Sequence, residues 1–421
     1  MKDIDKLDLK LTKYKITKFL ITVGNTEIDL DPRFIAAFRI EDEFDAYDFP
    51  FFEFTLTIHN KYYRLMKKNP NNIHVVLNIK IAQFKQDELG TGNTNPPETM
   101  FLAGKFLAQI PDSTPVLNPD LYEDIEEEMG VDKDENSLQN GTTLFMSLYN
   151  EDKLVSSNSL CNYVCTSTNL TDALTLQLNC AGFKDVLLSP ATNDTMYHEF
   201  MLLPTKTNEA IEHICNDYGM HQEGTTIFHD FKYSYIIRKN GKCTAWHPNE
   251  YKKTYILYKP QITNARVYQG CCKDTDEKAN YITTQSCHML ESSKYFDQEY
   301  ATSFVVVDTK TGESVDVEAN TTRFPKESTT AKRVIKVNSG DMKTKDATKA
   351  YIDQLASTWQ FEIDSIDLEM LTPNKEFFVS FLDSTLAKYS GTYRIERYLA
   401  VFGKSDGEFY TGTVVAKFSK V

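Results

Sequence analysis

Apolar and polar residues alternate along much of the first quarter of the chain. In "FPFFEFTLTIHN" the apolar residues Phe52, Phe54, Leu56 and Ile58 lie at every second position, with Glu53, Thr55 and Thr57 between them. "IHVVLNIKIAQF" repeats the pattern at Val75, Leu77, Ile79 and Ile81. A period of two places each set on one face of a strand. Residues 12–110 are therefore expected to form several β-strands, with a short helical turn in "NKYYRLMKKNPNN".

The middle of the chain changes to a helical period. Apolar positions recur at spacings of three and four from Leu170, so a helix is expected after Asn169, with Gly182 at its end. A second helix is expected from a cap at Thr207 to a stop at Gly219. The apolar positions of the two helices are Leu170, Ala173, Leu174 and Leu178, and then Ile211, Ile214, Cys215 and Tyr218. With "FKYSYIIRKNGK" as a following strand and tight turn, this segment is predicted to be a small α+β unit.

The last part returns to strand patterns. "QITNARVYQG", "ATSFVVVDT" and "RVIKVNSGDM" are expected to be strands, and residues 344–358 one helix with Thr344 at its cap. The chain then finishes with "WQFEIDSID", "EFFVSFLD" and two long runs on either side of the turn signal "GKSDG". This terminal hairpin is expected to close a barrel, because closure removes exposed sheet edges.

Composition and charge narrow the function. The formal net charge is −14, with 23 Tyr and 26 Phe but only 2 Trp. An acidic protein is poorly suited to coating nucleic acid or an anionic membrane. No apolar run approaches the length of a membrane span, and "MKDIDKLDLKLTKYK" is not a secretory signal. Eight scattered cysteines are expected to be free thiols of a protein made in a reducing cytoplasm.

Two polar segments interrupt the first strand-rich part. Residues 85–98 form a Gly/Asn/Pro-rich loop, and residues 112–143 are predicted to be a long acidic loop. Acidic runs usually repel themselves and extend, which favours a solvated linker. The alternative for the acidic loop is an electrostatic contact with a basic partner.

The search for chemistry yields no catalytic, cofactor-binding or metal-binding residue. The sequence contains no HExxH, paired CxxC, P-loop or GxGxxG pattern, and "GKSDG" is a turn signal between two strand-like runs rather than a nucleophile elbow. Cysteines stand at 161, 165, 180, 215, 243, 271, 272 and 287, and histidines at 59, 74, 198, 213, 221, 229, 247 and 288. Neither set has the spacing of a zinc site. The chain is therefore predicted not to be an enzyme and to need no cofactor.

The order of the segments resembles the baseplate hub proteins of contractile phage tails and the hub part of type VI secretion spike proteins. The likeness is carried by four stretches: "FPFFEFTLTIHN" with "MFLAGKFLAQI", "NLTDALTLQLNCAGFKDV" with "TNEAIEHICNDYGM", "KDATKAYIDQLAS", and the terminal strands from "NKEFFVSFLD" onward. The resemblance implies a β-rich α+β fold with two tail-tube-like β-barrels. The implied domains are a first barrel over 1–145, a small α+β domain over 146–255, and strands and one helix over 256–421 that complete the second barrel.

The resemblance also implies a structural role. Three copies would form a ring that joins a sixfold tail tube to a threefold central spike and lines the channel for DNA or effectors. The expected partners are two further copies, the tube protein, the spike and other baseplate proteins, in a virion assembled in the bacterial cytoplasm. DNA would only pass through, and the chain would not insert into a membrane.

Two alternatives stay open from the sequence. A tail-tip cell-wall hydrolase would need a cleft hidden in residues 255–345, and "HPNEY" at 247–251 is the nearest pairing of His and Glu. A receptor or carbohydrate binder would need aromatic platforms, for which Trp246 and Trp359 are the two tryptophans.

Overall fold

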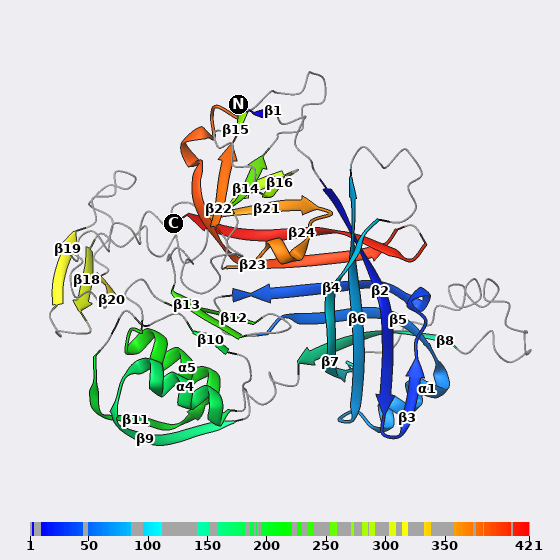
Figure 1. Ribbon diagram of the computed structural model, residues 1–421, viewed down its shortest axis with the longest axis horizontal. Helices are drawn as coiled ribbons and strands as arrows, with labels where there is room; N and C mark the ends of the chain where they lie inside the picture. Colours follow the sequence, from blue (N-terminus) through cyan, green and yellow to red (C-terminus); the bar gives the residue numbers. More distant parts are fainter. Residues whose placement is uncertain are drawn as a thin grey trace, which may run out of the picture.

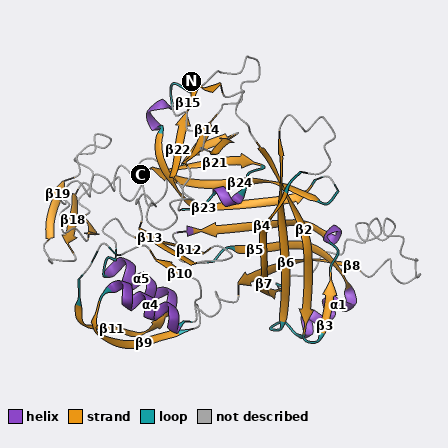
Figure 2. Ribbon diagram, viewed as in Figure 1, coloured by secondary structure: helices purple, strands orange, loops and turns teal. Residues whose placement is uncertain are grey.

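The structure is a computed structural model of the whole chain. It describes residues 2–3, 10–44, 49–85, 96–111, 141–150, 159–181, 186–188, 191, 193, 195–220, 225–229, 234–238, 253–258, 271–272, 280–284, 286–290, 303–308, 314–318, 332–337, 358–373, 376–381, 383–405 and 407–420. Strands dominate these residues and helices are few, so the predicted β-rich fold class is confirmed (Figure 2).

Eight strands pair in a closed circuit, which is a β-barrel. Going round the circuit, the order is β2, β6, β7, β8, β5, β4, β23, β24 and back to β2, and every pairing is antiparallel. The bounds are β2 Lys10–Val23, β4 Ile35–Glu43, β5 Phe51–His59, β6 Ile73–Lys85, β7 Glu98–Gln109, β8 Gly141–Asn150, β23 Gly391–Lys404 and β24 Phe409–Lys420. A short β3 (Thr26–Asp29) pairs with β2, and helix α1 (Asn60–Lys68) connects β5 to β6.

A second row of strands uses the same hairpin. Its order is β16, β14, β22, β23, β24, β21, β17. The new members are β14 Lys253–Tyr258, β16 Asn280–Thr284, β17 Ser286–Met289, β21 Thr358–Asp364 and β22 Glu376–Phe381. Only Gln285 separates β16 from β17 in the sequence, so the two ends of this row are held together by the chain.

The middle of the chain forms a separate α+β unit with its own core (Figure 1). Antiparallel strands β9 (Leu160–Thr168) and β11 (Tyr197–Lys206) pack with helices α4 (Leu170–Cys180) and α5 (Thr207–Glu212). A π-helical turn, His213–Asp217, extends α5. Strands β10 (Val186–Leu188), β12 (Thr225–His229) and β13 (Ser234–Arg238) form a small sheet. Phe49, just before β5, is buried in the core of this unit.

The start of the first helix and the end of the second are confirmed, with one correction at Thr207, while Gly182 lies outside the described residues. Asn169 caps α4 by accepting from the backbone N–H of Asp172, and Gly219 adopts φ 64° after the second helix. Thr207, however, is the first helical residue, and Lys206 occupies the cap position. The hydroxyl of Thr207 instead donates to the carbonyl oxygen of Ser159. The side chain that was expected to cap the helix therefore makes a tertiary contact.

The remaining described strands are short. β18 (Ser303–Asp308) lies between β19 (Ser314–Glu318) and β20 (Lys332–Val337), and β1 (Lys2–Asp3) pairs with β15 (Cys271–Cys272). The helix predicted at 344–358 lies outside the described residues except for Thr358, which begins β21. Of the acidic segment, residues 112–140 lie outside them, and 141–143 belong to β8. The domain boundaries stay a prediction.

The core follows the alternation of the sequence. The four apolar residues predicted for one face of β5 and the four predicted for β6 are all buried. Thr57, expected on the opposite face, is also buried, and its hydroxyl lies 2.9 Å from that of Thr143 on β8. A satisfied hydroxyl removes most of the cost of burying a polar side chain. One hydrophobic cluster runs from Tyr14 on β2 to Phe418 on β24 and so joins the barrel to the second row.

Candidate assembly surfaces

The hairpin β23–β24 belongs both to the barrel and to the second row of strands. Along β23, residues 391–393 pair with β22, whereas residues 397–403 pair with β4. Along β24, Phe409 and Tyr410 pair with β2, whereas residues 413–419 pair with β21. Figure 1 shows the red hairpin between the blue strands of the barrel and the orange and green strands of the second row. The C-terminal hairpin, expected to complete the second barrel, thus also closes the barrel of the N-terminal strands.

A β-bulge lets β23 pair with a strand of the barrel and with a strand of the second row. The register shifts between Ile395 and Arg397, so the buried side changes from Tyr393 and Ile395 to Tyr398, Ala400 and Phe402. An extra residue in one strand turns the following side chains to the other face. Sequence reasoning missed this bulge, and the only signal was the break in alternation within "GTYRIERYLAVF".

The two hairpin strands approach each other closely at Gly412. A Cβ at this position would lie 2.7 Å from Cδ1 of Phe402 and 2.8 Å from the carbonyl carbon of Val401. Real Cβ atoms essentially never show such distances. Glycine is therefore required where the shared hairpin is most tightly packed.

Two tyrosine hydroxyls tie the barrel to distant segments. The hydroxyl of Tyr14 donates to the carbonyl oxygen of Ile366 and accepts from the N–H of Leu368, both over 2.9 Å. The hydroxyl of Tyr410 lies 2.8 Å from the carbonyl oxygen of Pro32 and 2.9 Å from that of Ile35. Burial raises the pKa of both phenols, so they stay protonated donors.

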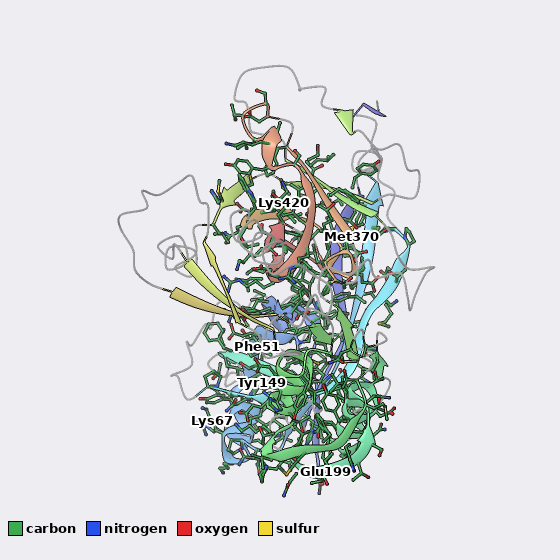
Figure 3. The ribbon with its side chains drawn as sticks, turned by 90° about the vertical axis from the view of Figure 1, so that its left-hand side faces the viewer. Phe51, Lys67, Tyr149, Glu199, Met370 and Lys420 are labelled. Atoms are coloured by element: carbon green, nitrogen blue, oxygen red, sulfur yellow. The ribbon has the colours of Figure 1, made fainter. Side chains whose placement is uncertain are left out.

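The outer face of the two-stranded sheet in the middle unit is apolar. Val164 on β9 is 57% exposed and lies opposite Met201 on β11, which is 54% exposed. Leu160 and Leu203 on the same strands are also exposed. Glu199, labelled at the lower end of Figure 3, is an exposed residue of β11 two positions before Met201. Clustered exposed apolar side chains are typical of surfaces that bind other molecules, so this face is a candidate assembly surface.

Two cysteines of the middle unit, Cys161 and Cys215, are buried in its core. Buried Cys161 lies against the side chains of Gln177 and Thr207, with 3.4 Å between its Sγ and Oγ1 of Thr207. Burial raises the pKa of the Cys165 thiol, and the neighbouring Cys180 adds to this shift. Thiols with raised pKa are poor nucleophiles at neutral pH. Among the described residues, no group of three or more His, Cys, Asp and Glu could hold a metal ion.

The other residues considered for chemistry do not converge. Trp359 is buried against Phe381 and Tyr389, with ring centroids 4.8 and 5.3 Å away, and is therefore a core residue rather than a sugar platform. His213 packs edge-on against Tyr218. Trp246 and "HPNEY" lie outside the described residues. None of the described helices is long and apolar enough to span a bilayer. The absence of a catalytic site and a cofactor stays a prediction.

Known structures share this fold. The 43 kDa tail protein of prophage MuSo2 from Shewanella oneidensis aligns with a TM-score of 0.50 and 9% identity over 96% of each chain. The tail protein from Neisseria meningitidis MC58 aligns with a TM-score of 0.51 and 10% identity, over 97% of this chain and 96% of that one. Identities this low show the fold alone.

A weaker alignment is found with one protein of a secretion system. The E. coli c3393 protein is described as a component of the type VI secretion system that is structurally similar to the T4 tail proteins gp27 and gp5. It aligns with a TM-score of 0.44 and 8% identity, over 94% of this chain and 76% of that one. Comparison with curated protein sequences finds no match.

The resemblance to phage tail proteins predicted from the sequence is confirmed, since the chain shares its fold with two tail proteins and matches a bacteriophage family model. The family model described as "Bacteriophage PBS1 gene 109 protein" matches residues 5–417, nearly the whole length. The chain therefore belongs to the bacteriophage PBS1 gene 109 protein family.

Proposed function

We propose that the protein is the structural hub of a phage tail baseplate. In this proposal three copies form a ring that adapts a sixfold tail tube to a threefold central spike and surrounds the channel. The chain acts through its surfaces and not through catalysis, and it resides in the virion after synthesis in the host cytoplasm. Its family and its tail-protein fold support the coarse assignment.

The observation that carries the proposal is the shared hairpin. Because β23 and β24 each pair with strands of both sets, the barrel and the second row are joined along continuous strands rather than by a linker. One chain then presents two strand-built units in a fixed relation. Three such chains offer six units around an axis, which is the symmetry that a sixfold tube requires.

The charge of the chain fits a DNA channel. With a net charge of −14, the protein repels a passing polyanion instead of retaining it. The proposed partners are two further copies, the tube protein, the spike and neighbouring baseplate proteins. Their contacts would be large surfaces, because stable assembly interfaces bury on the order of 1,600 Å² or more.

The mass of the protein in solution tests the proposal. Light scattering across a concentration series is expected to give a species of three times the chain mass of 48.3 kDa for the protein alone. With the tube and spike proteins of the same phage, it should give a heavier complex that contains three copies of the chain. Negative-stain images of that species should show a ring with a central opening. A chain that stays monomeric at every concentration and with both partners overturns the hub.

A further inference from the structure

Helix α1 carries an unusual concentration of positive charge. Its nine residues, "NKYYRLMKK", include four basic side chains and no acidic one. Lys61, Arg64 and Lys68 are exposed and stand three and four residues apart, which places them on one face of the helix. We refer to these three residues as the α1 basic face.

No described carboxylate neutralises this face. The ion pairs among the described residues use lysines and arginines of the strands and of the loop before β4. Near the helix, Lys61 lies over the ring of Tyr62 and Lys67 over that of Tyr63, at 5.6 and 5.9 Å. In a chain of net charge −14, three cations on one helix face that have no ion pair among the described residues form a local site for an acidic group.

The acidic segment of the same chain begins and ends beside this helix. At its start, Nζ of Lys67 in the last turn donates to the carbonyl oxygen of Pro111 over 2.9 Å. At its end, Gly141 pairs with His59, and the hydroxyl of Thr142 donates to the side-chain oxygen of Asn60 in the first turn. Figure 3 labels Lys67 on the helix at the edge of the molecule. The residues that flank the segment 112–140, Pro111 and Gly141, therefore lie at the two ends of α1.

The sequence of that segment complements the helix. Residues 112–140 contain ten acidic residues and one lysine, a net charge of −9 out of −14 for the whole protein. The helix is roughly 13 Å long at ~1.5 Å per residue, a distance that the segment spans many times over. Because both ends of the segment are tethered beside α1, the effective concentration of its carboxylates at the helix is on the order of 1 mM.

We infer that the α1 basic face binds the acidic segment 112–140 of its own chain. The attraction is electrostatic and between exposed groups, so salt weakens it. The tethers at Pro111 and Gly141 favour the same chain over a second copy, because only the same chain has its ends fixed at the helix. This contact is independent of whether the protein assembles into a ring.

Zero-length crosslinking of the full-length protein tests the inference. A carbodiimide should join Lys61 or Lys68 to carboxylates of the segment, and mass spectrometry identifies the linked peptides. The yield should fall several-fold in salt of about 1 M, where the screening length is only about 3 Å. A mixture of unlabelled and heavy-nitrogen-labelled protein should give links within one isotope form. Links between the two forms, or no links to α1, overturn the inference.

A proteolysis experiment gives a second readout. In the triple variant Lys61→Gln, Arg64→Gln, Lys68→Gln, cleavage by a glutamate-specific protease within 123–128 should be about fivefold faster, because cleavage follows the fraction of time that the segment is released. Glutamine keeps the helix propensity high. The matched control is Lys18→Gln, Lys105→Gln, Arg397→Gln, which removes the same charge from exposed strand positions. Equal cleavage rates in the two triple variants contradict the inference.

Discussion

The hydroxyl of Tyr14 donates to the carbonyl oxygen of Ile366 over 2.9 Å and joins residues 352 positions apart. The same oxygen accepts from the N–H of Leu368, so one phenol satisfies two backbone groups of the segment after β21. The ring meanwhile packs against Phe402 of the shared hairpin, with centroids 4.5 Å apart. A single β2 residue thus links the barrel wall, the hairpin and the second row of strands.

Tyr14→Phe is expected to lower the free energy of unfolding by about 1–3 kcal/mol, because it leaves the carbonyl oxygen of Ile366 and the N–H of Leu368 buried without this partner. Urea denaturation followed by circular dichroism measures the loss. Tyr62→Phe is the control, since the Tyr62 hydroxyl makes no hydrogen bond among the described residues and should change stability little. Equal effects of the two substitutions would show that the Tyr14 hydroxyl is energetically unimportant.

Gly412→Ala is expected to destabilise the protein by about 1–3 kcal/mol, the usual cost of forcing extra volume into a packed site. The new methyl group would overlap the backbone of Val401 and the ring of Phe402. Gly403→Ala is the matched control in the same hairpin, because a Cβ there meets nothing within 4 Å. Thermal unfolding of both variants compares them. A Gly412 variant as stable as the Gly403 variant contradicts the close approach.

Phe38→Ala is expected to lower stability by about 3–5 kcal/mol, as for other buried aromatic truncations. Phe38 stacks on Phe402 at 4.6 Å inside the barrel, whereas Trp359 lies in the second row. Because the two sets share one hairpin and one core, the fluorescence of Trp359 should report the loss at the same denaturant midpoint as circular dichroism does.

The fluorescence experiment uses a Trp246→Phe background, so that Trp359 is the sole tryptophan. Phe145→Ala is its control, since Phe145 is 48% exposed on β8 and should shift the midpoint little. If Phe38→Ala leaves the Trp359 transition in place while the dichroism transition moves, the two sets of strands unfold independently and the shared hairpin does not couple them.

Stability should also depend on Glu396 in a pH-dependent way. Burial opposes ionisation of Glu396, but the hydrogen bond and charge of Lys417, 2.6 Å away, outweigh it and hold the pKa of Glu396 below its ordinary value. A carboxyl group with a lowered pKa in the folded state stabilises the protein above its unfolded pKa of about 4.3, and this stabilisation is lost as the pH falls through the folded pKa.

Glu396→Gln should therefore cost about 1 kcal/mol at neutral pH and nearly nothing once wild-type Glu396 is protonated. Denaturation between pH 7 and pH 3 measures the difference. Glu408→Gln is the control: Glu408 pairs with Lys15 at the surface, where solvent screens the pair. A cost that does not change with pH would assign the effect of Glu396 to packing.

The alternation in "FPFFEFTLTIHN" was sufficient to predict which side chains of β5 enter the core, and the cap at Asn169 was sufficient to start α4. Both signals are local, because a period of two or a side-chain cap depends on a few neighbouring residues. The tail-protein likeness was also predictable, since the order of strand-rich and helical segments is a property of the chain. By contrast, Val164 and Met201 lie side by side on an exposed surface because β9 pairs with β11, and local patterns did not predict that pairing.

Local residue patterns are sufficient to predict the strand faces, the helix after Asn169, the stop at Gly219 and a terminal hairpin around "GKSDG". Which strands pair with one another depends on tertiary packing. The hairpin closes the N-terminal barrel as well as extending the second row, because the bulge after Ile395 turns β23 from one set to the other. Contacts between residues far apart in the chain direct the Thr207 hydroxyl to the carbonyl oxygen of Ser159 and Nζ of Lys67 to that of Pro111. Such contacts depend on how strands twist and pack in three dimensions, which local residue patterns do not encode.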